Sequence, residues 1–351
     1  MGVSAGGQRE SAQQVTAPAP RSHAESLRVA HARLLRRQRT ALRSVLEDIG
    51  AYRETIGRRL AGYRGINPDL VRLTGDLQEA ELTLFRALNR SVRWHRRLTI
   101  SDMLAIWTGE SRPEVVRLAS RMTEAGLYAS LRNGVSFRAA LGSATANAHG
   151  EIVEIVAEAL RNGLSASALA QSIMPYLNGA ESIPLPAGGK MDLRRIPTPL
   201  RGQARQLQFN AERIAVTELS IARAETEMLA FLSNPAVAAV RWVLSANRGK
   251  TRLPDICDAL AGMDAYGLGP GVYPVDRVPP LPHPFCRCSR LPLAGLRSPG
   301  MRAGPVNLMT LAGYAEHPPG YQQKIATQFG TALADGERAQ AVVEGFLSTA
   351  S

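Results

Sequence analysis

The stretch SHAESLRVAHARLLRRQRTALRSVLEDIGAYRETIGRRLAG, residues 22–62, carries the clearest structural pattern in this chain of 351 residues. Apolar residues such as Leu34, Val45 and Ile56 recur in it at helical spacing. A stripe with this period predicts one long amphipathic helix. The polar side of that helix is mostly arginine: Arg28, Arg33, Arg36, Arg37, Arg39 and Arg43.

The segments on either side of this helix complete a helical N-terminal region. Residues 1–21 are rich in Gly, Ser, Gln, Ala and Pro without a periodic apolar stripe, which predicts a disordered arm. A second helix starts at Asn67-Pro68-Asp69 and runs to about Arg97. Shorter helices follow at residues 99–106, 113–125 and 137–160, and at 163–173 with Ser165 as a cap. We expect residues 22–180 to form a helical domain.

The chain changes character at residues 181–203, where prolines and glycines crowd into a linker or extended loop. A helix over 204–232, a strand over 236–244, a helical turn over 253–261 and a strand over 286–293 predict an α+β module at 204–295, with 267–284 irregular. The tail, 296–351, ends in a helix over 320–347. The fold class is therefore a mainly α N-terminal region with a small α+β C-terminal module.

Composition narrows the setting in which the protein works. The net charge of +12 and the isoelectric point near 10.3 indicate an anionic neighbour, such as nucleic acid or an acidic protein surface. No apolar run approaches the roughly 20 residues that cross a bilayer, so we expect no membrane contact. The N-terminus lacks the apolar core of a signal peptide. Three cysteines are too few for a disulfide framework and fit a reducing cytoplasm.

The sequence PPLPHPFCRC, residues 279–288, gathers one histidine and two of the three cysteines, and Cys257 lies upstream. Cys257, His283, Cys286 and Cys288 have the composition of a Cys3His zinc site. Because the protein would fill all four positions, such a zinc would be structural and not catalytic. Three alternatives fit the same residues: a disulfide from Cys257 to Cys286 or Cys288, reduced thiols packed as small apolar groups, and a loop held in shape by its prolines in which the thiols have no role.

The run RSVRWHRR, residues 90–97, is the most basic short segment. Arginines around a stackable tryptophan predict a nucleic-acid contact through Arg90, Arg93, Arg96 and Arg97. The alternative is a solvated helix end with Trp94 in the core, where basic residues complement the helix dipole.

Catalytic patterns are lacking in this sequence. It holds no phosphate-binding Gly-Lys loop, no His-Glu-x2-His and no Gly-x-Ser-x-Gly. Asp255 and Asp258 would form an acid/base set near His283, but no residue presents itself as the nucleophile. We expect a protein that is not an enzyme, with a metal-dependent, nuclease-like enzyme as the remote alternative.

Several of these residues, in their order along the chain, resemble one family. Arg213-x3-Thr217-Glu218, then Trp242 on a strand, Asp255-x-Cys257, Tyr273-Pro274 and finally the loop with Pro280, His283 and Pro284 resemble the phage Mu F-like minor head proteins, the head morphogenesis proteins of tailed phages. The resemblance covers about residues 200–295. It departs where Leu281 and Pro282 both precede His283, and where Cys257 stands alone in place of a Cys-x2-Cys pair.

The resemblance implies a low-copy virion protein that acts in procapsid and head assembly near the portal. It further implies the portal protein and the major capsid or scaffold protein as partners, packaged DNA as a neighbour, and a role in DNA packaging or ejection. The expected location is the virion head, and the host cytoplasm during assembly. No catalytic residue is carried over, and a basic nucleic-acid-binding protein independent of virions is the alternative function.

Overall fold

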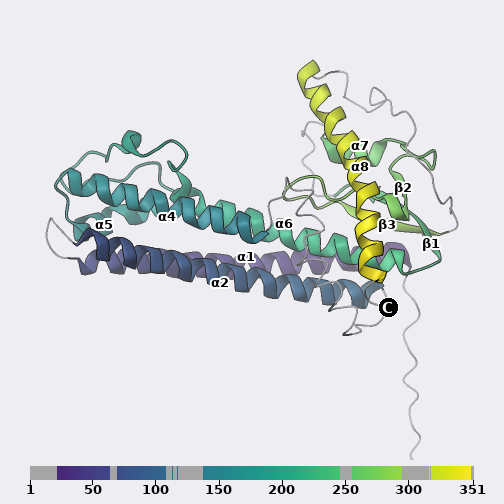
Figure 1. Ribbon diagram of the computed structural model, residues 1–351, viewed down its shortest axis with the longest axis horizontal. Coiled ribbons are helices and arrows are strands. Elements are labelled where there is room, and N and C mark those ends of the chain that lie inside the picture. Colours follow the sequence, from purple (N-terminus) through teal and green to yellow (C-terminus); the bar gives the residue numbers. More distant parts are fainter. Residues whose placement is uncertain are drawn as a thin grey trace, which may run out of the picture.

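The computed structural model describes residues 22–63, 69–107, 137–245, 255–294 and 318–348, with the single positions 113, 117 and 316. The predicted arm 1–21, most of the predicted helix 113–125 and most of 296–317 lie outside the described residues. The fold class is the predicted one, because long helices build the N-terminal region and a small antiparallel sheet lies in the C-terminal part (Figure 1).

Long helices make the N-terminal region an extended rod. The rod consists of α1 (His23–Gly62), α2 (Leu70–Trp107), α4 (Phe137–Arg161) and the first half of α6 (Gln203–Leu232), which run along the long axis of the molecule, with α5 (Ala166–Leu177) at one end (Figure 1). With 40 residues, α1 alone spans about 60 Å. Ser22 caps its start by accepting the Glu25 N–H, as Ser165 caps α5 through the Ala168 N–H.

The buried side of α1 explains why the rod is long and nearly straight. From position 30 on its buried residues follow steps of four, four and three: Ala30, Leu34, Gln38, Ala41, Val45, Ile49, Tyr52, Ile56 and Leu60. This eleven-residue repeat is close to the natural period of an α-helix, so the stripe faces the core along the whole length with little supercoiling.

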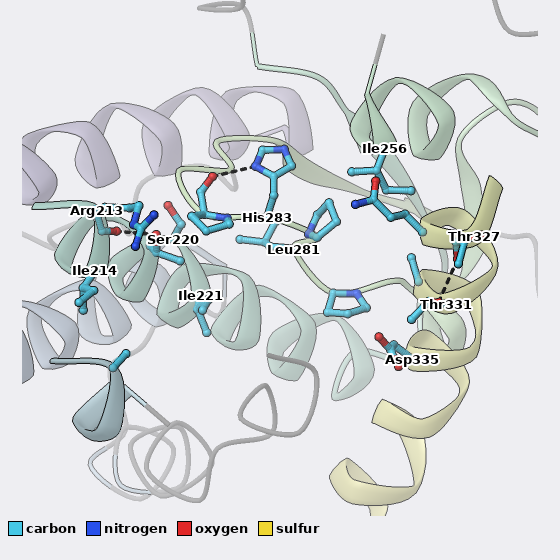
Figure 2. A pocket seen from close by; sticks show the side chains of 17 residues that line it. Arg213, Ile214, Ser220, Ile221, Ile256, Leu281, His283, Thr327, Thr331 and Asp335 are labelled. Atoms are coloured by element: carbon cyan, nitrogen blue, oxygen red, sulfur yellow. Dashed lines mark hydrogen bonds between the residues drawn. The ribbon is translucent and has the colours of Figure 1, made fainter. Parts of the chain in front are cut away.

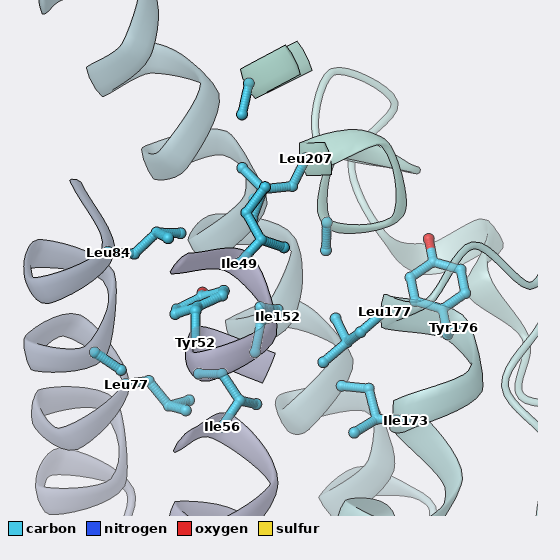
Figure 3. Packing of buried hydrophobic residues seen from close by; sticks show 14 of the residues in the cluster. Ile49, Tyr52, Ile56, Leu77, Leu84, Ile152, Ile173, Tyr176, Leu177 and Leu207 are labelled. Carbon is cyan, nitrogen blue, oxygen red and sulfur yellow. The ribbon is translucent and has the colours of Figure 1, made fainter. Parts of the chain in front are cut away.

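Figure 3 shows how that stripe is filled. Ile49, Tyr52 and Ile56 of α1 pack among Leu and Ile side chains from the neighbouring helices, all of them buried. These neighbours are Leu77, Leu84, Ile152, Ile173, Leu177 and Leu207. Tight aliphatic packing of this kind makes each Leu or Ile truncation cost about 2–5 kcal/mol.

The predicted break between two helices near residue 98 is wrong, because α2 is continuous to Trp107. Residues 76–108 contain neither glycine nor proline, so nothing in this stretch ends a helix. Within it the Thr99 hydroxyl donates to the His95 carbonyl oxygen one turn earlier, at 2.9 Å, and the helix passes through.

The segment 181–203 packs against the rod instead of spacing two parts of the molecule. Ile183, Met191 and Ile196 are buried in the same core as the rod helices. Helix α6 then belongs to both regions, since Leu207 lies in the rod core and Phe231 in the core of the module. The rod and the module are therefore joined by one shared helix.

The module is built on a three-stranded antiparallel sheet in the order β2-β1-β3. The central strand β1 (Val237–Val243) confirms the strand predicted at 236–244. Strand β3 (Ser289–Ala294) starts three residues after the predicted position, and β2 (Val272–Pro274) lies in a stretch expected to be irregular. With three residues and a proline, β2 is too short to show the alternation that identifies a strand.

Two helices complete the module. Helix α7 (Ile256–Gly262) confirms the predicted helical turn, and α8 (Pro319–Ser348) confirms the predicted C-terminal helix. The tail helix is an integral part of the module, because Ile325, Phe329 and Leu333 are buried in its core. No helix among the described residues is both long enough and apolar enough to cross a membrane.

Candidate metal centre

Cys257 is placed by the start of α7. The Asp255 side chain accepts the Cys257 N–H at 2.9 Å, and the Asp258 side chain accepts the Asp255 N–H at 2.7 Å, which together form a capping box. The two aspartates that the sequence offered as an acid/base set thus both hold this helix start. Cys257 is buried directly after the cap.

The loop 279–288 is anchored at both ends by buried arginines. Arg290 of β3 donates to the Pro279 carbonyl oxygen at 2.7 Å, and Arg223 of α6 donates to the Cys288 carbonyl oxygen. Both guanidinium groups are at most 1% exposed. Charge-assisted bonds in a dry environment fix the ends of the loop strongly.

The middle of the loop is held by Thr217 of α6. Its hydroxyl donates to the Arg213 carbonyl oxygen at 2.6 Å and accepts the Phe285 N–H at 3.2 Å. Phe285 has a φ of 59°, a conformation that non-glycine residues rarely adopt. The Thr217 contact therefore stabilises a strained turn that directs His283 and Cys286 toward Cys257.

The side chains of these residues meet in one cluster. Cys257 Sγ lies 3.7 Å from Cys286 Sγ and 3.0 Å from His283 Nε2, and Asp255 Oδ2 lies 3.6 Å from the same nitrogen. Two groups of donor atoms result, each within 4.8 Å: Cys257 with Cys286 and Cys288, and Cys257 with Asp255 and His283. Each of the four predicted ligands belongs to one of these two groups, and Cys257 belongs to both. Asp255, which the sequence analysis placed near His283 as an acid/base residue, is a further donor in the second group.

The three thiols are free, so the predicted alternative of a disulfide is not formed. Hydrogen bonds from Cys257 and then from Cys286 lower the pKa of Cys288, against the effect of its burial. Hydrogen bonds to Cys286 and Cys288, together with burial, raise the pKa of Cys257. A lowered pKa favours the thiolate form of Cys288, which is the form in which cysteine binds a soft cation.

His283 presents the nitrogen that a metal would need. Its Nδ1 lies 2.8 Å from the Pro284 carbonyl oxygen, which can only accept a hydrogen bond. Nδ1 therefore carries the proton, and the lone pair of Nε2 is directed at Cys257. The donor atoms of this centre are close enough to hold a metal ion.

A groove of about 630 Å³ borders the centre (Figure 2). Its walls come from α6, the proline loop and α8, and His283 belongs to the wall beside the centre. Arg213, Thr331 and Asp335 are among its other lining residues. The His283 side chain is 27% exposed, whereas the three cysteines are buried.

The other residues of the family pattern lie around the centre. Glu218 pairs with Arg96 of α2 at 3.5 Å, and both side chains are buried. Trp242 is buried on β1 under the guanidinium of Arg290, whose central carbon lies 5.5 Å from the ring centroid. Pro280 lines the groove. These contacts link the sheet, the loop and the rod.

The four arginines predicted to contact nucleic acid do not all lie on the same side of α2. Arg90, Arg93 and Arg97 are exposed, but Arg96 is buried against Glu218 and points away from them. Trp94 is 57% exposed, so the alternative that placed it in the core is wrong. Three of the four predicted arginines and the tryptophan share an outer surface.

Sequence reasoning missed the buried charges beneath the loop. Arg223 and Glu227 are fully buried, with Nε and Oε1 3.7 Å apart. In the sequence they look like an ordinary i, i+4 pair on a helix surface, so no signal marked them as interior. Burial raises the pKa of Glu227, although Arg223 and Arg290 act against the shift.

A scan of protein-family models finds no match for this chain, and neither do searches of curated proteins and of solved structures. What the centre can do therefore has to be argued from its own residues.

Proposed function

We propose that this protein is a minor head protein of a tailed phage or prophage, a low-copy structural component that acts in procapsid assembly near the portal. The proposal rests on one observation. Residues of the family pattern that lie far apart in the sequence, Thr217, Asp255, Cys257 and the loop 279–288, meet in one cluster. Residues of the pattern that are distant in the sequence therefore form one structural unit in the fold.

The bonding of these residues favours a structural role over catalysis. The Thr217 hydroxyl is used twice, Asp255 caps α7, and Glu218 forms a buried ion pair. Polar groups that are already engaged with the backbone or with each other are poorly placed to act on a substrate. On this proposal the protein acts without a catalytic step, as a framework in the virion head.

The shape and charge of the molecule suit such a framework. A rod whose first helix alone spans about 60 Å can bridge neighbouring subunits. The net charge of +12 favours contact with an acidic portal, capsid or scaffold surface, or with packaged DNA. Through these partners the protein would aid DNA packaging or ejection.

Mass spectrometry of purified procapsids and virions tests this function. We expect peptides of this chain at low copy number, with portal peptides in the same sample as the reference. Absence of the chain from both kinds of particle, while portal peptides are detected, would contradict the proposal.

Within this function, the centre formed by Cys257, His283, Cys286 and Cys288 holds a structural zinc. Zinc–sulfur bonds of about 2.3 Å in a tetrahedral site place two sulfurs about 3.8 Å apart. The Cys257 and Cys286 sulfurs are 3.7 Å apart without any adjustment. Zinc would supply a cross-link between α7 and the loop, with all four positions filled by the protein.

Metal analysis of the purified protein tests the zinc. We expect one zinc per wild-type chain and its loss in Cys286→Ser, which keeps the side-chain size but replaces the thiolate. His23→Gln, an exposed position at the start of α1, is the matched control and should keep the metal. A wild-type protein that is purified without chelators and contains no zinc would contradict the proposed zinc site.

A further inference from the structure

One outer surface of α2 gathers cations around an exposed aromatic ring. Its residues are Arg86, Arg90, Arg93, Trp94 and Arg97, all of them exposed. Their spacing of four, three, one and three residues places them on one side of the helix. We call this surface the arginine face.

The arginine face gathers four cations on about three turns of α2. Between Glu81 and Asp102 the sequence of the helix contains no acidic residue. His95 and Arg96 are buried on the opposite side of the helix. On the neighbouring helix α1, burial raises the pKa of the half-buried Asp48, and the charge of Arg90 acts against this shift.

The exposure of the Trp94 side chain is not explained by the charge of this surface. Its side chain is 57% exposed, although an indole gains free energy by burial. An acidic protein surface would match the arginines but offers no special partner for a flat ring. A nucleic-acid base does, because stacking on an aromatic side chain stabilises the contact by about 1–3 kcal/mol per base.

The spacing of the cations favours a single strand. Successive arginines are three or four residues apart, which is about 4.5–6 Å along the helix axis, and the whole row spans about 16 Å. A flexible strand can place several phosphates along such a row and turn one base onto the ring between them, whereas the bases of a duplex are stacked inside it.

We propose that the arginine face of α2 binds single-stranded nucleic acid, with the arginines on phosphates and Trp94 stacked on a base. The inference is independent of the role in the phage head, because it rests on this surface alone. It also refines the sequence prediction, since Arg96 is excluded from the site and Arg86 is added to it.

Binding of the full-length protein to a fluorescent 15-nucleotide oligothymidine, measured by anisotropy from 50 to 200 mM salt, tests the proposal. We expect the logarithm of the binding constant to fall with the logarithm of the salt concentration, with a slope near −2.1 if Arg86, Arg90 and Arg97 contact three phosphates at about −0.7 each. Replacement of Arg90 and Arg97 by glutamine should reduce this slope by about 1.4. Trp94→Ala should weaken binding roughly 5- to 100-fold.

The controls separate this proposal from its rivals. Arg72→Gln removes an exposed arginine from the same helix outside the face. In this variant, Trp94→Ala should weaken binding by the same factor as it does in the wild type. Poly-glutamate should compete poorly, and a 15-base-pair duplex should bind more weakly than the single strand. Equal affinities of Trp94→Ala and wild type, tighter binding of the duplex, or full competition by poly-glutamate would each overturn the proposal. Because the assay needs no virion, its failure is distinct from failure of the head-protein assignment.

Discussion

The charges buried beneath the loop are the least expected residues in this protein. Arg223 and Arg290 use their guanidinium groups to hold the carbonyl oxygens at the two ends of the loop. Glu227 supplies the opposite charge from the next turn of α6, without exposure to solvent. Two buried cations and one buried anion are tolerated here because the arginines are bonded to the backbone.

The buried Glu227 carboxyl should make the free energy of unfolding depend on pH. Burial raises its pKa in the folded protein above the value of 4.5 for a free glutamate. As pH rises above 4.5, the unfolded chain loses its proton first, so the free energy of unfolding falls until the folded carboxyl also ionises. The unfolding free energy of the wild type minus that of Glu227→Gln, both measured by urea titration, should therefore decrease from pH 4 to pH 8.

Glu54→Gln, at an exposed position of α1, is the control for the general effect of losing a carboxylate. A wild-type curve that stays parallel to the Glu227→Gln curve over this range would show that the raised pKa is wrong.

The sequence indicated the candidate metal donors, together with Thr217 and Asp255, but not the buried arginines that hold the ends of the loop. Cys257, His283 and Cys286 were recognisable because their chemistry is rare and their spacing is short. Arg223 and Arg290 were not, because arginine in a helix or strand is normally solvent-exposed. Whether an arginine is buried depends on what packs over it, and here that is the loop, which is distant in sequence from α6.

The N-terminus of helix α6 is capped by a residue of another helix. Gly202 at its N-cap has no side chain to offer, and Glu151 of α4 takes this role. The Glu151 carboxylate accepts the N–H groups of Gly202 and Ala204 at 2.5 and 2.6 Å, and the Tyr176 hydroxyl at 2.6 Å. A carboxylate at this position also complements the helix dipole.

Glu151→Gln tests this cap. The amide offers one acceptor oxygen in place of two and turns donors toward the N–H groups of α6, so we expect a loss of roughly 2–3 kcal/mol in unfolding free energy. Chemical denaturation measures the loss. Glu154→Gln, one turn away on the same helix and 39% exposed, should change stability by less than about 0.5 kcal/mol. Equal effects of the two substitutions would contradict the capping role.

Helix α8 docks on the module through a glycine. A Cβ atom at Gly336 would lie 2.5 Å from the Arg277 carbonyl oxygen, so the backbone of α8 is in close approach there. Gly336→Ala should destabilise the protein by about 1–3 kcal/mol, because α8 must move away from the module. Thermal unfolding should report a lower midpoint.

The same helix offers the matched control. Gly330 has no atom within 4 Å of the Cβ position, so Gly330→Ala should stabilise the helix by up to about 1 kcal/mol. Opposite signs for the two substitutions are expected, and a stabilising Gly336→Ala would mean that α8 does not dock through this position.

Elements with a local signal were predictable, and those defined by distant contacts were not. The apolar stripe of α1 and the cap at Ser165 were visible in the sequence and match the structure. Strand β2 was missed because its three residues become a strand only by pairing with β1. The extent of α2 was mispredicted because a break was placed where no helix-breaking residue exists.

The described residues form two large apolar cores and a small third cluster of Ala30, Met103 and Ile106, and one continuous helix, α6, joins the two large cores. Its first half is buried in the rod and its second half in the module, and the buried Arg96–Glu218 pair connects it to α2 between them. The candidate metal centre lies on the module side, where α7, the loop and β3 meet. Such an arrangement allows the centre to stabilise the module while the rod is held by its own apolar packing.

The central claim is that this centre locks the module through a bound metal. The most direct measurement is calorimetric unfolding of the wild-type protein before and after removal of zinc by a chelator, with zinc added back as the final step. We predict that removal destabilises the module by more than about 3 kcal/mol and that zinc restores it, since the binding energy of a structural metal is folding energy. Identical unfolding of the protein with and without zinc would contradict the account.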